Sequence, residues 1–544
     1  MTTIRPLKLA IIGAGPSGFY TASRILSLLP ADSEKGKHVS IHMYDRLPTP
    51  YGLVRYGVAP DHPEVKNCQE KFDGLAADPR FRFFGNVSVG TTSSPSSSAT
   101  TAYTYPDAVH LPLSQLVPYY STVLFTYGSS LSNPLPRTAH SAFSASPLQN
   151  VLPALAFVSW YNGHPAYTHL TDLLDLSAID EATVIGHGNV AIDVARMLLK
   201  SPDALAHTDM PTPVVEKLRA SRIRKVSAVG RRGPAQVSFT TKEFREMVNL
   251  PGVKFNSIDE TLMADARRMV EGDRPRKRLM DLMSKGGKST GDTAREFELG
   301  FLKSPQAFLA AEDATSGTSP SQKVSHIKWS INTLLAPPAP PPHPPHPPAA
   351  PATTTDETPS TAVVARPTGE ETTTRAGLVI ESVGYRSESL SSGAEGELAL
   401  PFDEKRGRIA NEGGRVVDES GIMIPGFYTA GWVASGPIGV IASTMQYAYS
   451  VASLIINDHF IQPPSSNAAA LSNPLPSSPE HGLPQALLDA GAQNASVPGG
   501  KAGKRVVEMR DWERIDRVEV ERGREVRKPR EKILSVKEML EVLP

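Results

Sequence analysis

The sequence is almost without cysteine, since Cys68 is the single one in 544 residues. An internal disulfide, a redox-active Cys-x-x-Cys pair, a cysteine-ligated iron–sulfur cluster and a zinc ribbon are therefore all excluded within this chain. The class of disulfide reductases is excluded with them. If the chain carries out redox chemistry, its electrons must pass to an acceptor outside the chain.

Long apolar runs and an excess of one charge are also missing. No apolar run approaches about 18 residues, so we expect no transmembrane helix. Lys+Arg and Asp+Glu are balanced at 56 each, which gives no overall electrostatic reason to expect a nucleic-acid partner. The first apolar run starts by Leu7, so we expect almost no room for a transit peptide before it. Composition alone favours a soluble intracellular protein with more than one domain.

Three stretches have compositions that are atypical of a packed core. Residues 91–102 are rich in Ser and Thr, residues 336–360 contain a dense proline run, and residues 463–500 are rich in Ser, Pro, Ala and Gly. Such compositions are typical of flexible or polyproline-like segments. His343 and His346 lie in the proline run, where solvated linker residues are a better interpretation than metal ligands. We therefore expect no metal site.

Two glycine-rich motifs stand out against this background. Residues 13–18 (GAGPSG) follow the apolar run 9–12, and residues 186–191 (GHGNVA) follow the apolar run 182–185. In dinucleotide-binding units the first glycine permits a tight turn, the second lets the backbone approach a pyrophosphate, and the third position packs the helix against the strand. The phosphates would rest on N–H groups at the start of each helix. Two motifs predict two dinucleotides with electron transfer between them.

The residues beyond the two motifs differ in charge. Asp45 ends the strand-like run 39–45, where a carboxylate can hydrogen-bond a ribose hydroxyl of FAD or NAD. Arg231 and Arg232 end the corresponding run after the second motif, and guanidinium groups bind phosphate in a fork. The second site is therefore expected to prefer NADP. Arg231 lies about 40 positions after the second motif, whereas the charged residue of such a unit usually follows by ~20. Residues 201–222 are therefore expected to form an extra surface segment.

The alternation of strand-like and helix-like runs predicts an α/β fold with two Rossmann-like dinucleotide-binding domains. We expect buried strands at 377–384 and 426–431 and an apolar helix at 439–456. An NADP-binding domain (131–375) is expected to be inserted into a discontinuous FAD-binding domain. The two parts of that domain would be residues 1–130 and 376–544, the second ending in a C-terminal tail.

Longer stretches of the chain resemble the adrenodoxin reductase-type ferredoxin–NADP⁺ reductases of mitochondria. The stretches that carry the resemblance are residues 51–67, 157–165, 186–199, 229–247, 274–279, 431–445 and 528–533. The resemblance implies an FAD-dependent NADPH:ferredoxin (adrenodoxin) oxidoreductase in the mitochondrion, and it leaves a peripheral membrane position open. The segment 133–155 departs from the family, because it contains no acidic residue.

Site residues follow from the motifs and from the resemblance. FAD contacts are expected from Gly13, Gly15, Ser17, Gly18, Asp45, Leu53, Val87, Trp432, Gly439, Val440 and Ile441. NADP contacts are expected from His187, Gly188, Asn189, Val190, Arg231, Arg232 and Glu243, with Gly439 also on the nicotinamide side. Hydride transfer needs no general base, so no catalytic residue is expected. His62 either tunes flavin protonation or is structural.

A local run of positive charge suggests where a protein partner would bind. We call Arg245, Arg274, Arg276, Lys277 and Arg278 the basic cluster. Because ferredoxins of the resembling family are acidic, an acidic 2Fe–2S ferredoxin is expected to dock there, near Arg245, Arg274 and Arg278.

Three alternatives remain open on the sequence. One is a flavin-dependent oxidase or monooxygenase, and another is an inactive nucleotide-binding homologue. The third is the flavoprotein subunit of a glutamate synthase, which shares the architecture but usually carries N-terminal cysteines that this chain lacks.

Overall fold

The computed structural model describes residues 4–90, 105–287, 294–310, 323–336, 363–391, 398–438, 441–461, 475–476, 479–495 and 504–544. The serine-rich stretch 91–102, all but the first residue of the proline-rich stretch 336–360, and Gly439 with Val440 lie outside these residues. For Ile441 only the backbone is described, as the first residue of a helix.

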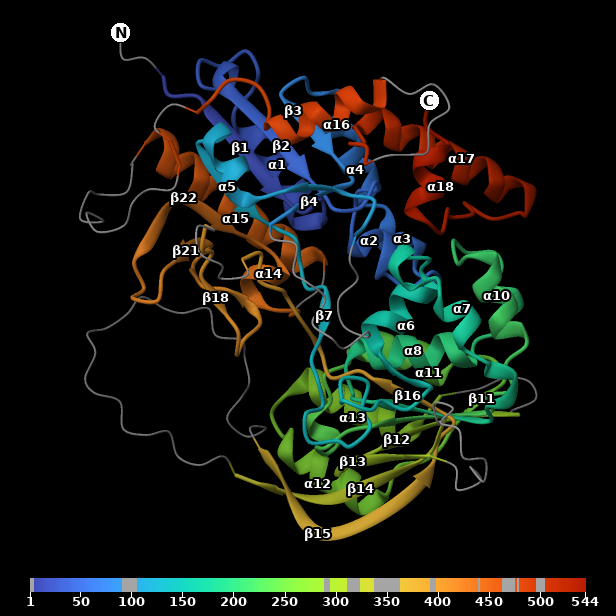
Figure 1. The fold of residues 1–544 in the computed structure, drawn as a ribbon. Helices are drawn as coiled ribbons and strands as arrows, with labels where there is room; N and C mark the ends of the chain where they lie inside the picture. Colours follow the sequence, from blue (N-terminus) through green and yellow to red (C-terminus); the bar gives the residue numbers. More distant parts are fainter. Residues whose placement is uncertain are drawn as a thin grey trace, which may run out of the picture.

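A first sheet forms the upper half of the molecule in Figure 1. Its strands run in the order β20-β21-β22-β6-β1-β2-β3. Their bounds are β1 (Leu7–Ile12), β2 (Val39–Tyr44), β3 (Phe81–Phe84), β6 (Thr122–Phe125), β20 (Asn411–Glu412), β21 (Arg415–Val417) and β22 (Met423–Thr429). Pairs among β3, β2, β1, β6 and β22 are parallel, whereas β20 and β21 form an antiparallel edge. We call this sheet and the helices on it the first domain.

A second sheet lies below the first and has the order β11-β12-β10-β9-β16-β8. Its strands are β8 (Val151–Pro153), β9 (Glu181–Ile185), β10 (Lys225–Val229), β11 (Val253–Phe255), β12 (Arg295–Gly300) and β16 (Leu378–Glu381), all paired in parallel. We call this sheet and its helices the second domain. A three-stranded antiparallel sheet adjoins it, with strands β13 (Lys303–Ala310), β14 (Val324–Leu335) and β15 (Val364–Arg375).

Apolar runs explain why the parallel strands of both sheets are buried between layers of helices. Five of the six residues of β1 and four of the five residues of β9 are buried. Continuous apolar runs are typical of parallel strands that helices cover on both faces. Helix α1 (Pro16–Leu28) packs against α15 (Ile441–Phe460) in the first domain, and α8 (Asn189–Leu199) packs against α6 (Ala154–Tyr161) and α11 (Thr241–Val248) in the second. The predicted α/β fold with two parallel-sheet units is confirmed.

Two expectations about the second domain need correction. The chain was expected to return to the first domain at residue 376, but β16 pairs with β9 and β8 in the second sheet. Residues 201–222 were expected to be an extra surface segment, but they form α9 (Pro202–Leu205) and α10 (Thr212–Arg219), of which only one side is exposed. Leu205, Met210 and Val214 of this segment are buried in the core of the second domain. The insertion is therefore an integral part of that core.

The C-terminal third also contains more folded structure than its composition indicated. Within the segment 463–500, α16 (Gln485–Ala495) packs Leu487 and Ala490 into a core of the first domain, so the flexible interpretation is wrong there. The C-terminal tail forms α17 (Met509–Glu525) and α18 (Val536–Glu541). Trp512 and Met539 of these helices are buried in the first domain's core. In Figure 1 this red segment lies beside α2 and α3 and above α10.

Candidate active site between the two domains

Both glycine-rich motifs open onto one cavity between the domains. Its volume is about 2390 Å³, well above the roughly 300–1,000 Å³ typical of a pocket for one small molecule. Residues of both motifs line it, together with the strand ends that follow them. The cavity therefore has space for two cofactors in contact with each other.

The first glycine of each motif is required by backbone geometry. Gly13 has φ +105° and Gly186 has φ +130°, a region that L side chains rarely adopt. A Cβ on Gly13 would lie 2.4 Å from Cα of Tyr127, and a Cβ on Gly186 would lie 2.1 Å from the carbonyl oxygen of Ser382. Each motif thus begins with a tight turn against a neighbouring strand end, as the sequence predicted.

The second glycine of each motif leaves open space instead. A Cβ on Gly15 would have its nearest neighbour 3.9 Å away, and a Cβ on Gly188 would have none within 4 Å. Both residues are the N-caps of their helices, α1 and α8, and neither cap has a side-chain hydrogen bond. The starts of both helices line the cavity, so their unpaired N–H groups, which begin at Ser17 in α1 because Pro16 has none, can bind an anion such as a pyrophosphate.

The third position packs the helix closely against the strand in both motifs. A Cβ on Gly18 would lie 2.7 Å from the carbonyl oxygen of Gly13, and Ala191 is fully buried. Ser17 of the first motif lines the cavity and packs against Gly431, where a Cβ would come within 2.1 Å of the Ser17 Oγ. All three roles of the fingerprint are thus present twice in the structure.

Asp45 lies at the cavity wall and also braces the first motif. Its carboxylate accepts hydrogen bonds from the N–H of Ala14 at 2.8 Å and of Leu47 at 3.0 Å. Burial raises the pKa of Asp45, and these two N–H donors oppose the shift. Two carboxylate oxygens are therefore held at the end of β2, where the ribose of a dinucleotide bound to the first motif would lie.

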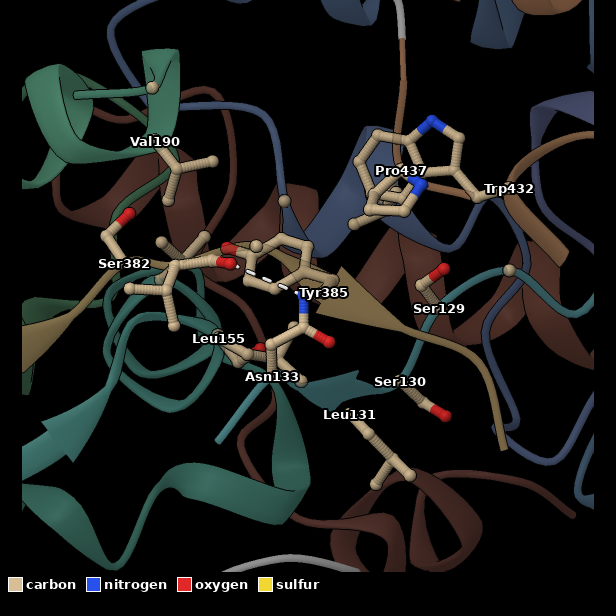
Figure 2. Close-up of a pocket in the computed structure, with 18 of the residues that line it drawn as sticks. Ser129, Ser130, Leu131, Asn133, Leu155, Val190, Ser382, Tyr385, Trp432 and Pro437 are labelled. Carbon is tan, nitrogen blue, oxygen red and sulfur yellow. Dashed lines mark hydrogen bonds between the residues drawn. The ribbon is translucent and has the colours of Figure 1, made fainter. Parts of the chain in front are cut away.

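Three apolar residues expected at the flavin site line the same cavity: Leu53, Val87 and Trp432. Leu53 is the first residue of α2 (Leu53–Tyr56), and Trp432 is the first of α14 (Trp432–Ser435). The ring of Trp432 lies 6.2 Å from that of Tyr385 between centroids. Figure 2 shows Trp432 with Pro437 on one side of the pocket, Val190 and Ser382 on the other, and Tyr385 between them in this view.

The side chains of the second motif hold its surroundings in place. His187 places Nε2 3.0 Å from the carbonyl oxygen of Ala228, and its ring lies 4.8 Å from that of Phe301. Burial lowers the pKa of His187 to about 4, so the imidazole is neutral at pH 7. Asn189 accepts a hydrogen bond from the N–H of Thr240 at 2.8 Å. Because both side chains already have partners in the protein, a nucleotide would contact mainly the backbone of these two residues.

Positive charge collects at one end of the cavity. Arg231 and Arg232, the expected NADP contacts, line it, and so do Arg137 and Lys303, which the sequence analysis did not identify. Lys303 donates its N–H to the carbonyl oxygen of Gly230 at 3.1 Å. Among the described residues, no carboxylate lies within ion-pair distance of Arg137, Arg231 or Lys303. No sequence signal connects Arg137 with this site, because non-local hydrogen bonds such as Ala139 N–H to Gln306 O (2.9 Å) bring it there.

A buried ionic network joins the two domains beside the second motif. Arg196 of α8 is 2% exposed and lies 3.0 Å from Asp61 of the first domain, 2.9 Å from Asp193 and 3.4 Å from Glu243. Burial raises the pKa of Asp193 to about 6, although Arg196 opposes the shift. Because Asp61 comes from the loop 57–62, this contact fixes the approach of that loop to the motif helix.

His62 and Glu243 belong to the edge of this network. The Nε2 atom of His62 lies 2.7 Å from a carboxylate oxygen of Glu246. Side-chain atoms of His62, Glu243 and Glu246 lie within 4.8 Å of one another, as metal ligands do. However, the guanidinium of Arg196 is 3.4 Å from Glu243 and 3.7 Å from Glu246. These two carboxylates are therefore paired with Arg196 and not with a metal ion.

A parallel-sheet fold with two dinucleotide motifs that face one cavity defines an oxidoreductase that binds two nucleotides. Comparison with known proteins identifies the family. The chain is 36% identical over 540 residues to the mitochondrial NADPH:adrenodoxin oxidoreductase of Drosophila melanogaster, covering 98% of this chain and 93% of that protein. It is 36% identical over 549 residues to the mitochondrial enzyme of Bos taurus, covering 98% and 92%. No family model matches the chain.

A solved structure gives the same answer. Mycobacterium tuberculosis FprA in complex with NADPH superposes with a TM-score of 0.74 at 30% identity, covering 99% of both chains. The chain belongs to the NADPH:adrenodoxin oxidoreductase family. The resemblance noted in the sequence is therefore confirmed, and so is the predicted cofactor pair, FAD and NADP.

Proposed function

We propose that this chain is an FAD-dependent reductase that passes electrons from NADPH through FAD to an iron–sulfur ferredoxin. The observation that carries the proposal is the shared cavity, onto which two dinucleotide motifs open from different domains. The single cysteine supports an external acceptor, because a chain without a cysteine pair has no dithiol to receive the electrons. Family membership favours this activity over an oxidase, an inactive homologue or a glutamate synthase subunit.

The residues at the first motif fit FAD, and those at the second fit NADPH. When bound, FAD and NADPH would supply the redox chemistry of hydride and single-electron transfer. The open N–H groups at Gly15 and Gly188 would bind the two pyrophosphates. Asp45 would hold the flavin nucleotide's ribose, and Trp432 would form a wall beside the ring system. Positioning and exclusion of water are the protein's contribution, since no general base is required.

Spectroscopy of the purified protein tests this proposal. The protein should be yellow with about one FAD per chain, and anaerobic NADPH should bleach the flavin absorbance. Cytochrome c reduction by NADPH should depend on added ferredoxin. Rapid oxygen consumption without ferredoxin would instead favour an oxidase. A folded protein that takes up no FAD would favour an inactive homologue.

The docking site for ferredoxin is proposed to be the basic cluster. Arg274, Lys277 and Arg278 are exposed on α13 (Arg274–Lys285), and Arg245 is exposed on α11. None of these four forms an ion pair with another described residue, whereas Arg276 lies 3.5 Å from Asp273. Unpaired positive charge of this kind attracts an acidic partner and speeds encounter more than it tightens binding.

Charge reversal tests this docking site. Changing Arg274 and Arg278 together to Glu should slow ferredoxin-dependent cytochrome c reduction by roughly tenfold or more at low salt. Reduction of ferricyanide by NADPH should stay near the wild-type rate, because that small acceptor needs no docking surface. Changing Lys323 and Arg375 together to Glu is the matched control, because both are exposed at the three-stranded sheet and neither forms an ion pair with another described residue. Parallel loss of both activities would show that the cluster is structural.

We further propose a mitochondrial location. The curated relatives from Drosophila, Bos taurus and Arabidopsis are named as mitochondrial, whereas FprA is bacterial. Across the described part of the chain, no helix is long and apolar enough to cross a membrane. Co-fractionation of the tagged full-length chain with a mitochondrial matrix marker tests the location, and recovery in the cytosolic fraction would contradict it.

A further inference from the structure

The C-terminal segment 528–533 was singled out in the sequence, yet no step of the proposed reaction uses it. It follows α17 and turns back along that helix. Arg527 takes up the turn with φ +59°, and the N–H of Lys528 donates to the carbonyl oxygen of Gly523 at 2.8 Å. A Cβ on Gly523 would lie 2.4 Å from Cα of Arg530, so helix and segment touch without space for a side chain.

A fully buried carboxylate fixes this segment to the first domain. Glu519 of α17 accepts hydrogen bonds from Nη2 of Arg55 at 2.6 and 2.8 Å. The same carboxylate accepts the N–H of Ile533 at 2.9 Å. Arg55 is 3% exposed and lies in α2, whose neighbouring residues Leu53 and Tyr56 line the cavity. The segment is therefore tied directly to the helix that borders the flavin side.

Lys532 extends from this anchored segment into the second domain. Its side chain is fully buried. Its ammonium donates to the carbonyl oxygen of Asn162 at 2.9 Å and to that of Arg55 at 3.2 Å, and it lies 3.0 Å from a carboxylate oxygen of Asp209. Asn162 directly follows α6, and Asp209 lies between α9 and α10. One cation thus binds backbone from both domains.

A second contact of the segment stabilises a helix end in the second domain. Glu531 accepts hydrogen bonds from the N–H of Thr212 at 2.7 Å and from its hydroxyl at 2.9 Å. Thr212 is the first residue of α10, where a carboxylate satisfies a free N–H and interacts favourably with the helix dipole. Lys528 donates to the carbonyl oxygen of Met210 and to the hydroxyl of Thr212, both at 2.8 Å.

We propose that Lys532 is a positioning residue that sets the separation of the two nucleotide sites. The inference rests on the proposed function, because it concerns the transfer between those sites. Lys532 binds the carbonyl groups of Arg55 and Asn162, and the residues next to them, Tyr56 and Tyr161, line the cavity from opposite domains. A shift of about 1 Å in reacting atoms can lower a rate by about 10²-fold. The loss of this cross-domain link should therefore slow hydride transfer more than it weakens nucleotide binding.

The surrounding charges make Lys532→Met a suitable variant. Lys66, Asp209 and Arg55 are the charged groups that face Lys532. Burial lowers the pKa of Lys532 to about 7 against the opposing effect of Asp209, so removal of its charge also removes a desolvation cost. Asp209 keeps Lys66 as a partner at 2.7 Å, so no carboxylate is left buried and unpaired. The methionine side chain retains most of the apolar stem that packs near Gly163.

The experiment is anaerobic stopped-flow reduction of the FAD-loaded full chain by saturating NADPH. In Lys532→Met the flavin reduction rate should fall roughly 10- to 100-fold. FAD content, reduction by dithionite and the Kd for NADP⁺ should stay within about twofold of wild type. Lys537→Met, at a residue 77% exposed on α18, should match wild type in every measurement.

The outcomes separate the inference from the proposed function. If NADPH does not reduce wild-type flavin, the proposed function is wrong. If it does and Lys532→Met is reduced equally fast, or loses only affinity for NADP⁺, Lys532 is not a positioning residue. Should purified Lys532→Met lack FAD, it is reconstituted with excess FAD before the same comparison, and an unchanged reduction rate would then overturn the inference. A variant that takes up no added FAD would also overturn it, because Lys532 would then be needed for the flavin site itself and not for the separation of the two sites.

Discussion

Glu381 should make the stability of the second domain depend on pH in a range where most carboxylates are already ionised. It is the last residue of β16 and is 1% exposed. Its Oε1 accepts the N–H of Ala142 at 3.1 Å, whereas its Oε2 has no hydrogen-bond partner among the described residues. Burial raises the pKa of Glu381 to about 7, with the Ala142 N–H opposing the shift. Glu381→Gln removes this titration with little change in shape.

The sign follows from proton binding. The folded state holds the Glu381 proton more tightly than the unfolded state, whose pKa is 4.5. The free energy of unfolding therefore falls as pH rises from about 4.5 to about 7 and then levels off. A shift of roughly 2.5 units corresponds to about 3 kcal/mol. Any cost of the glutamine amide itself is the same at both pH values. The change in the effect of Glu381→Gln on the free energy of unfolding between pH 5 and pH 8 therefore reports the titration of Glu381 alone.

Thermal unfolding of the FAD-loaded protein measures the effect. Glu381→Gln should gain about 2 to 3 kcal/mol relative to wild type on going from pH 5 to pH 8, because part of the full effect is already present at pH 5. For a domain of 150–250 residues this is roughly 4–12 °C in Tm. Glu271→Gln, at an exposed carboxylate of the same domain, is the control and should show no such gain. The reasoning is refuted if Glu381→Gln and wild type have parallel Tm profiles between pH 4.5 and 8.

Three further changes probe the nucleotide site. Gly188→Ala should keep the wild-type Tm but weaken NADPH binding, because its methyl group enters open cavity space. Gly186→Ala should lower stability by more than about 1 kcal/mol, because of its φ of +130°; equal Tm values would contradict this. Changing Arg231 and Arg232 to Ala should raise the KM for NADPH far more than that for NADH. Each phosphate contact that is lost should cost roughly 1.5–3 kcal/mol of binding free energy. Equal effects on both nucleotides would mean that neither arginine binds the 2′-phosphate.

The features that sequence predicted well are those whose physical requirement is local. Gly13 and Gly186 are needed because their own backbone has a positive φ, and Gly15 and Gly188 because a helix begins there. Strands were also expected at 377–384 and 426–431 and a helix at 439–456. The structure has β16 at 378–381, β22 at 423–429 and α15 at 441–460, because each element is encoded by an apolar run of its own residues.

The features that sequence missed depend on which distant segment becomes a neighbour. The apolar run of β16 is equally compatible with either sheet, and only its pairing with Ala182 in β9 assigns it to the second. Residues 201–222 were misjudged because their buried side chains, such as Met210, fill space that another part of the chain leaves open. Nothing near Lys532 in the sequence indicates that Asp209 is its partner.

Helix α11 connects the cavity with the proposed ferredoxin surface. Glu243 lines the cavity, whereas Arg245 of the basic cluster, two residues later, is exposed to solvent. Residues two apart on a helix point in different directions, so the two faces are separated by little more than a helix diameter, about 10 Å. A ferredoxin at the basic cluster would therefore rest on the second domain, on the outer side of a helix that forms the cavity wall. Since α11 also pairs with Arg196 through Glu243, the same ionic network that joins the domains would support the docking surface.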